Sequence, residues 1–131
     1  MRQSAIVYLA SFIIVLPLDV IFLRTAGRLF GENARQLMLD SPTPAIFFYV
    51  IYVACTVSFI NGATPADWRE NAFRGAQLGL FFYASFELAS MALLNHWKWA
   101  VMLPDVLWGA VITALAASAG GWLANWILIK I

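Results

Sequence analysis

Residues 72–94 read AFRGAQLGLFFYASFELASMALL, a stretch that is long and apolar enough for a helix that spans a membrane. Gly75 and Gly79 stand four residues apart within it, and this spacing lets two membrane helices approach closely. Glu87 interrupts the apolar pattern, although a charged side chain at the centre of a membrane helix costs about 2.5–3.5 kcal/mol. The stretch therefore predicts a closely packed membrane helix that carries a polar site.

Three further segments have the length and composition of membrane-spanning helices: residues 5–23, 44–60 and 101–129. Of the 131 residues, 63% are hydrophobic and 11% are charged, whereas about 25% are charged in a soluble domain. We therefore expect an all-α fold, an integral membrane four-helix transmembrane bundle that forms a single transmembrane domain over residues 1–131. The lipid bilayer is its expected partner.

The connections between the expected spans differ in length and character. Residues 24–43 mix charged and apolar side chains, which predicts an extension of the first helix and then an amphipathic segment at the membrane surface. The next connection is short, and a helix start is expected near Pro65, with Asp67 inside the first turn. Between the third and fourth spans, Trp97 fits an aromatic belt at the membrane interface.

The charge balance and the cysteine content exclude several classes of function. The formal net charge is +1 and no basic stripe is present, so no nucleic-acid partner is predicted. Cys55 is the single cysteine and His96 the single histidine, so we expect no internal disulfide, no metal and no cofactor. Lysine and arginine residues divide equally between the two sides of the membrane. The short, arginine-flanked connection between the second and third spans favours cytoplasmic termini.

Three acidic residues inside the expected spans fall at a common depth. Asp19 lies near the end of the first span, Glu87 near the end of the third, and Asp105 near the start of the fourth. Because successive spans run in opposite directions, all three lie on one side of the membrane, roughly 6–10 Å inside the interface. A shared polar pocket between the first, third and fourth helices is the expected consequence.

Other side chains lie at helical spacing from the acids or just beyond them. Tyr83 lies one turn before Glu87 and can donate a hydrogen bond to it. Two arginines follow Asp19 on the same side of the membrane and are the expected counter-charges. The candidate ligand-binding site is therefore made up of Asp19, Glu87, Asp105, Tyr83, Trp108, Arg24 and Arg28. No catalytic residue is assigned.

Each acid also has an ordinary structural interpretation. Asp19 could form an ion pair with one of the two arginines near the interface. Asp105 could interact with the dipole at a helix N-terminus, since a proline precedes it. Glu87 could be satisfied by Tyr83 and a neighbouring helix.

Two short sequences in the first and fourth spans resemble each other. Residues 16–22 read LPLDVIF and residues 103–109 read LPDVLWG. Both place a proline before the acid and an aromatic residue three positions after it. An internal duplication and a chance match between apolar sequences are both open interpretations.

A series of short motifs includes the acids and runs along most of the chain: Leu18-Asp19, Phe22, Leu37-Met38, Gly79, Tyr83, Phe86-Glu87-Leu88, Trp97, Asp105, Trp108 and Gly109. In these motifs the chain resembles the bacterial predicted-membrane-protein family called domain of unknown function 2177. That family usually has tryptophan at Phe22, tyrosine-aspartate at Phe86-Glu87 and threonine-asparagine at Ala89-Ser90. The resemblance implies a four-helix, multi-pass protein of the bacterial inner membrane with a polar site, and it brings no established activity.

Three classes of function are compatible with these residues. One is the binding or transport of a proton, cation or small amphipathic solute by a homo-oligomer, since ionisable groups inside a membrane mark such pathways. Another is an accessory subunit of a larger membrane complex. The last is a membrane enzyme of lipid or isoprenoid metabolism with one acid as general acid or base, although no G-x-S-x-G or P-loop motif is present.

Overall fold

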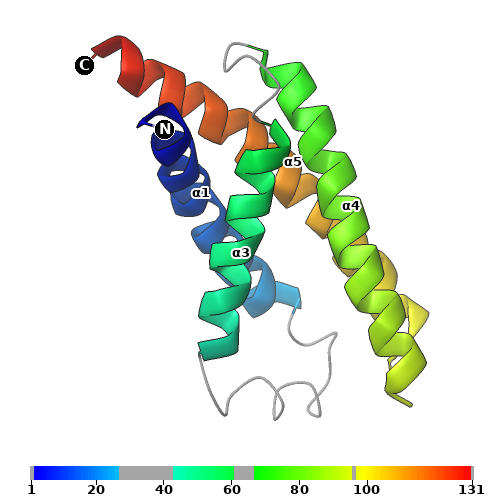
Figure 1. Ribbon diagram of the computed structural model, residues 1–131. Coiled ribbons are helices and arrows are strands. Elements are labelled where there is room, and N and C mark those ends of the chain that lie inside the picture. The colour runs from blue at the N-terminus through cyan, green and yellow to red at the C-terminus, as the bar shows by residue number, and fades with distance from the viewer. Residues whose placement is uncertain (1, 27–42, 61–66, 96, 131) are drawn as a thin grey trace.

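The computed structural model describes residues 2–26, 43–60, 67–95 and 97–130. These residues form four α-helices and no strand: α1 (Arg2–Ala26), α3 (Thr43–Ile60), α4 (Trp68–Leu93) and α5 (Trp99–Lys130) (Figure 1). The all-α fold is therefore confirmed, and each expected span coincides with one helix to within a few residues. The expected amphipathic segment at residues 24–43 lies mostly outside the described residues.

Three helices in the described part of the chain are long and apolar enough to cross a membrane. They are α1, through Ala5–Phe22, together with α4 and α5. α3 has 18 residues, which gives it a length of about 27 Å, and its apolar part, Ile46–Phe59, is shorter. Large apolar side chains are exposed on all four helices, as expected of a surface that contacts a membrane.

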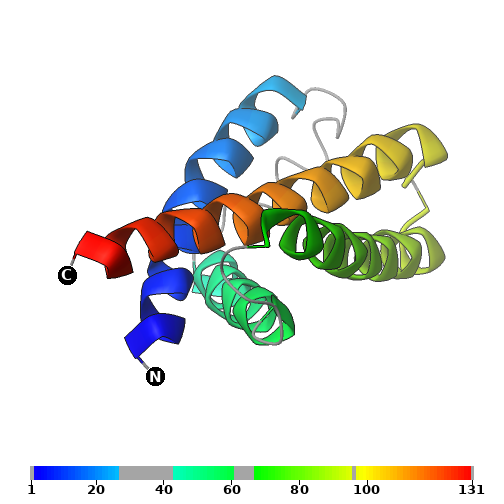
Figure 2. The ribbon, with the colours of Figure 1, turned by 90° about the horizontal axis from the view of Figure 1, so that it is seen from above.

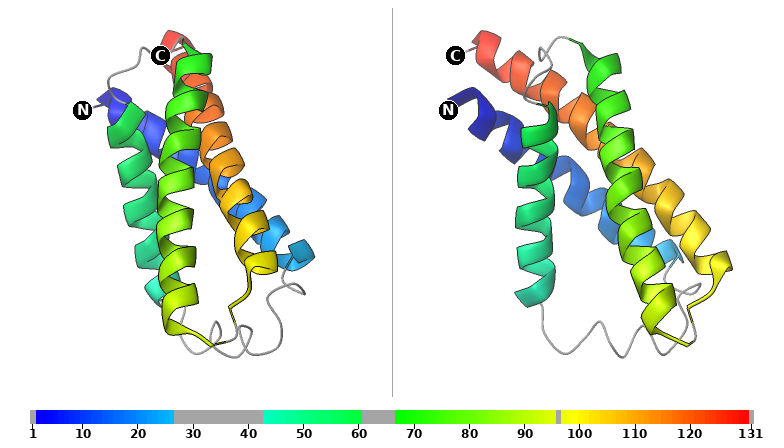
Figure 3. Two further views of the ribbon diagram at one scale, coloured as in Figure 1. Left: turned by 90° about the vertical axis from the view of Figure 1, so that its right-hand side faces the viewer. Right: turned by 45° about the vertical axis from the view of Figure 1, so that its right-hand side comes forward.

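Successive helices in the structure run in opposite directions. The N- and C-termini lie at one end of the molecule, and the connection between α4 and α5 lies at the opposite end (Figures 1 and 3). The end of α1 and the start of α3 also lie at that opposite end. The last turns of α1 and α4 and the first turns of α3 and α5 therefore gather in one region.

The start of α4 differs from the start expected from the sequence. The helix begins at Trp68, and Asp67 is its N-cap: the Asp67 carboxylate accepts a hydrogen bond from the backbone N–H of Glu70 at 3.2 Å. The expected position of Asp67 inside the first turn is wrong, because a short acceptor side chain satisfies a free N–H group from the cap position. Pro65 lies outside the described residues.

α4 and α5 form the most extensive helix contact, and glycines lie within it. A Cβ atom on Gly75 would come within 2.5 Å of the backbone oxygen of Thr113, and one on Gly79 would meet the backbone of Gly109. On α5, a Cβ atom on Gly109 would clash with the ring of Tyr83. The close approach predicted at Gly75 and Gly79 is present, and α5 is the partner helix.

α1 crosses α5, whereas α4 runs alongside part of it (Figure 2). At this crossing the Ser11 hydroxyl donates a hydrogen bond to the backbone oxygen of Ala116 at 3.2 Å. A Cβ atom on Gly120 would meet Ser11, so the two backbones lie close together. α1 and α5 therefore also pack through small residues.

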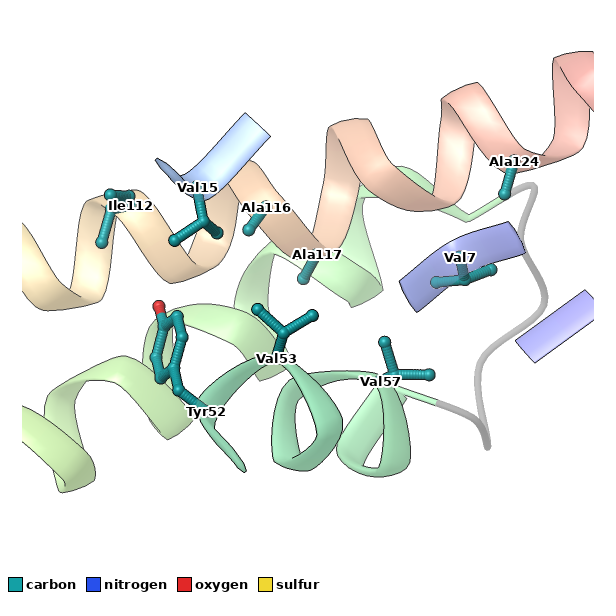
Figure 4. Close-up of a cluster of buried hydrophobic side chains, with 9 residues drawn as sticks. All are labelled: Val7, Val15, Tyr52, Val53, Val57, Ile112, Ala116, Ala117 and Ala124. Carbon is teal, nitrogen blue, oxygen red and sulfur yellow. The ribbon is translucent and has the colours of Figure 1, made fainter. Parts of the chain in front are cut away.

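An apolar cluster lies between α1, α3 and α5 (Figure 4). It consists of Val7, Val15, Tyr52, Val53, Val57, Ile112, Ala116, Ala117 and Ala124. The hydroxyl of Tyr52 points toward α5 and forms a hydrogen bond with the hydroxyl of Thr113. Thr113 in turn donates to the backbone oxygen of Gly109 at 2.6 Å, one turn earlier on α5. At one edge of the apolar cluster, the hydrogen bond between Tyr52 and Thr113 therefore joins α3 to α5.

We expect Gly79→Leu to destabilise the protein by about 1–3 kcal/mol, the usual cost of forcing a larger side chain into a packed contact. The new side chain would meet the Gly109 backbone and separate α4 from α5. The measurement is the temperature at which the detergent-solubilised protein loses its monodisperse size-exclusion peak. Ala89→Leu, at an exposed position on α4, is the control. Equal losses in both variants would contradict the glycine contact.

Candidate functional site

Asp19 lies in the second half of α1 and is 6% exposed. Its Oδ2 atom accepts a hydrogen bond from the hydroxyl of Tyr49 on α3. Its Oδ1 atom accepts one from the indole Nε1 of Trp108 on α5 at 3.2 Å. One carboxyl group therefore joins three helices, and both of its donors are neutral aromatic side chains.

The indole of Trp108 is also held by an aromatic stack. The ring of Phe22 lies parallel to it, with ring centroids 4.5 Å apart and an interplanar angle of 4°. Phe22 is three residues after Asp19, so both side chains lie on one face of α1. That face contacts Trp108 through a hydrogen bond at the nitrogen and through stacking on the ring.

Glu87 lies near the end of α4 and is 0% exposed. Its Oε2 atom accepts a hydrogen bond from the indole Nε1 of Trp97, in the connection between α4 and α5. No side chain or backbone group of the described residues donates to its other oxygen, Oε1, which is also buried. A buried acceptor without a donor is costly, so Oε1 is the unsatisfied oxygen of this carboxyl group.

Asp105 lies in the second turn of α5 and is 9% exposed. Its carboxyl group contacts that of Glu87 at hydrogen-bonding range. Ionised carboxylates have acceptors only, so a hydrogen bond between the two groups requires a proton on one of them. Asp19 acts on Asp105 only electrostatically. The structure thus brings Glu87 and Asp105 into contact and places Asp19 beside them with its own partners.

Tyr83 lies within electrostatic range of both Asp19 and Asp105. Its ring packs against Gly109 and meets the ring of Tyr52 edge to face, with centroids 6.5 Å apart. Its hydroxyl group interacts electrostatically with both Asp19 and Asp105. The hydrogen bond expected from Tyr83 to Glu87 is not formed, because the room at Gly109 lets the ring lie across α5 and Trp97 supplies the donor.

Of the two arginines expected as counter-charges, the structure describes Arg24. Arg24 is exposed on α1, and the ion pair within the described ranges is Arg74–Glu70 on α4, at 2.6 Å. The expected ion pair between Asp19 and Arg24 is therefore absent, because Tyr49 and Trp108 already supply the donors. Arg28 lies outside the described residues.

Two donors in the site were not expected from the sequence. Tyr49 lies in the almost entirely apolar segment 44–60, and only its phenol group, at a spacing of three residues from Tyr52, distinguishes it. Trp97 was expected in an interfacial belt, yet its indole N–H bonds to Glu87. The available signal in both cases was an aromatic side chain with a polar tip near a buried acid, since such tips usually find a partner.

The fold and the site define a helical membrane protein whose buried carboxyl groups gather toward one end of the helices. The chain belongs to the family described as "Predicted membrane protein (DUF2177)", which matches residues 4–122. The family resemblance drawn from the sequence motifs is therefore confirmed, and the matched range includes all three acids. No curated protein and no solved structure matches the chain.

We expect Trp108→Phe to destabilise the protein by about 1.5–3 kcal/mol, the range for a hydrogen bond to a charged group. The change keeps an aromatic ring against Phe22 but removes the donor to Asp19. Thermal stability in detergent is the measurement. Trp122→Phe is the matched control, because Trp122 is on the same helix and is 62% exposed. A variant as stable as the control would show that the bond to Asp19 contributes nothing.

Proposed function

We propose that this protein binds a proton or a small cation at the acidic site between α4 and α5 and carries it across the membrane. The observation that carries the proposal is the Oε1 atom of Glu87, which is buried and receives no donor from the described residues. A proton and a cation are two ligands that a buried carboxylate oxygen without a protein donor can bind.

The surroundings of Glu87 are compatible with reversible binding of a proton or a cation. Its polar partners among the described residues are the neutral indole of Trp97 and the acid Asp105, and no ion pair with a described residue involves Glu87. Trp97 belongs to the connection at the end of the molecule, whereas Glu87 belongs to a helix. The site therefore combines a donor from the connection with an acceptor from α4.

The proposal includes the membrane arrangement of the chain. α3 acts as a fourth span beside α1, α4 and α5, and the protein is a multi-pass protein of the bacterial inner membrane with cytoplasmic termini. An apolar cluster fills the space between α1, α3 and α5, so we infer that a conduit requires a homo-oligomer or a larger membrane complex. The alternation of helix direction, with both termini at one end (Figure 3), supports an even number of spans.

Reconstitution of the purified protein into proteoliposomes tests the function. We expect uptake of radiolabelled sodium, rubidium or methylammonium along an imposed gradient, and a loss of uptake on the order of ten-fold in Glu87→Gln. Such a loss corresponds to about 1.4 kcal/mol of binding free energy. Glu70→Gln, a change to an exposed glutamate on the same helix, is the control. Absence of uptake of every tracer, and of proton flux, would overturn the proposed transport.

A fusion to the C-terminus tests the orientation. A reporter that is active only in the cytoplasm should be active, and one that is active only outside it should be silent. The reverse pattern would place the acidic site on the cytoplasmic side, because the acids lie at the end away from the termini.

A further inference from the structure

We propose that Glu87 and Asp105 hold one proton between them, and that a monovalent cation displaces this proton when it binds. The inference rests on the proposed cation site and states what that site contains before the cation arrives. Its consequence is a fixed exchange, in which one proton is released for each cation bound.

The contacts of Glu87 leave one place for the proton. Oε2 accepts from Trp97, whereas Oε1 is buried and faces no donor in the described residues. The Asp105 carboxyl group contacts that of Glu87. Neither group can donate when ionised, so the contact becomes a hydrogen bond only when the pair carries a proton.

Among the described residues, the groups around the pair do not supply a positive charge to replace the proton. Asp19 from α1 adds a further negative charge beside Asp105. Tyr83 on α4 contributes a neutral phenol group near Asp105, and Tyr49 and Tyr52 from α3 lie near Tyr83. Lys98 follows Trp97 but is exposed, and none of the three acids takes part in an ion pair within the described ranges.

Charge balance determines the kind of cation. With one shared proton the pair carries a single negative charge. Loss of the proton to water would leave two negative charges in contact in a medium of low dielectric, which is strongly unfavourable. A monovalent cation returns the pair to a single negative charge, so the exchange leaves the net charge of the buried site unchanged. The Trp97 N–H supports the charge that stays on Glu87 in both states.

Infrared difference spectroscopy of the full chain in nanodiscs tests the shared proton. We expect a carboxylic-acid carbonyl band at neutral pH that is lost in Asp105→Asn and in Glu87→Gln. Asp105→Asn preserves a donor toward Glu87 and therefore the local packing, so it separates loss of the proton from loss of the fold. Glu70→Gln should leave the band unchanged. A wild-type spectrum without the band from acidic to neutral pH would overturn the inference.

Proton release on cation binding tests the exchange. In weakly buffered detergent solution, addition of sodium, potassium or methylammonium chloride should release about one proton per protein and abolish the acid band, whereas Asp105→Asn should release none. The three salts distinguish an alkali ion from an organic ammonium. Release by magnesium alone, or a band insensitive to every cation, would overturn the exchange. Cation uptake without proton release would leave the proposed transport standing, and release without uptake would leave only the exchange.

Discussion

The contact between α4 and α5 at Gly79 and Gly109 fixes the position of the site. The helices are antiparallel, and the missing side chain at Gly79 brings the α4 backbone against Gly109. In this register Glu87 lies level with residue 101, one turn or about 6 Å from the level of Asp105. Side chains on a helix incline toward its N-terminus. On antiparallel helices Glu87 and Asp105 therefore lean toward each other, which closes the gap between their carboxyl groups.

The crossing of α1 with α5 adds the third acid to the same region. In each helix an acid is followed three residues later by an aromatic side chain, and the two aromatic rings, Phe22 and Trp108, stack on each other. Trp108 then reaches back to Asp19, the acid of the other helix. The two similar sequences of the first and fourth spans thus meet in space. The residues that the two sequences share contact one another where α1 and α5 pack, whether the similarity arose by duplication or by chance.

The helices, and the end of the molecule at which the acids lie, could be predicted from the sequence, because hydrophobic length and chain direction determine them. The acids Glu87 and Asp105 could be placed near each other for the same reason. The hydrogen-bond donors of the acids could not be predicted in this way. Trp97 reaches Glu87 because the connection turns back at Leu94, whose carbonyl accepts the Trp97 backbone N–H at 3.3 Å. The hydrogen bond from Tyr49 to Asp19 depends on how α3 packs against α1. An almost entirely apolar helix has no periodic pattern that predicts this packing.

The choice of neutral donors for the buried acids bears directly on function. A buried arginine beside a carboxylate would hold it ionised permanently, and removing either partner would leave an uncompensated charge. Asp19 instead accepts hydrogen bonds from a phenol and an indole. Glu87 accepts a hydrogen bond from an indole and contacts the carboxyl group of Asp105. The N–H group of an indole and the O–H group of a phenol stabilise a negative charge but do not neutralise it. In the proposed function, a mobile ligand balances this negative charge, whereas a structural ion pair would already have balanced it.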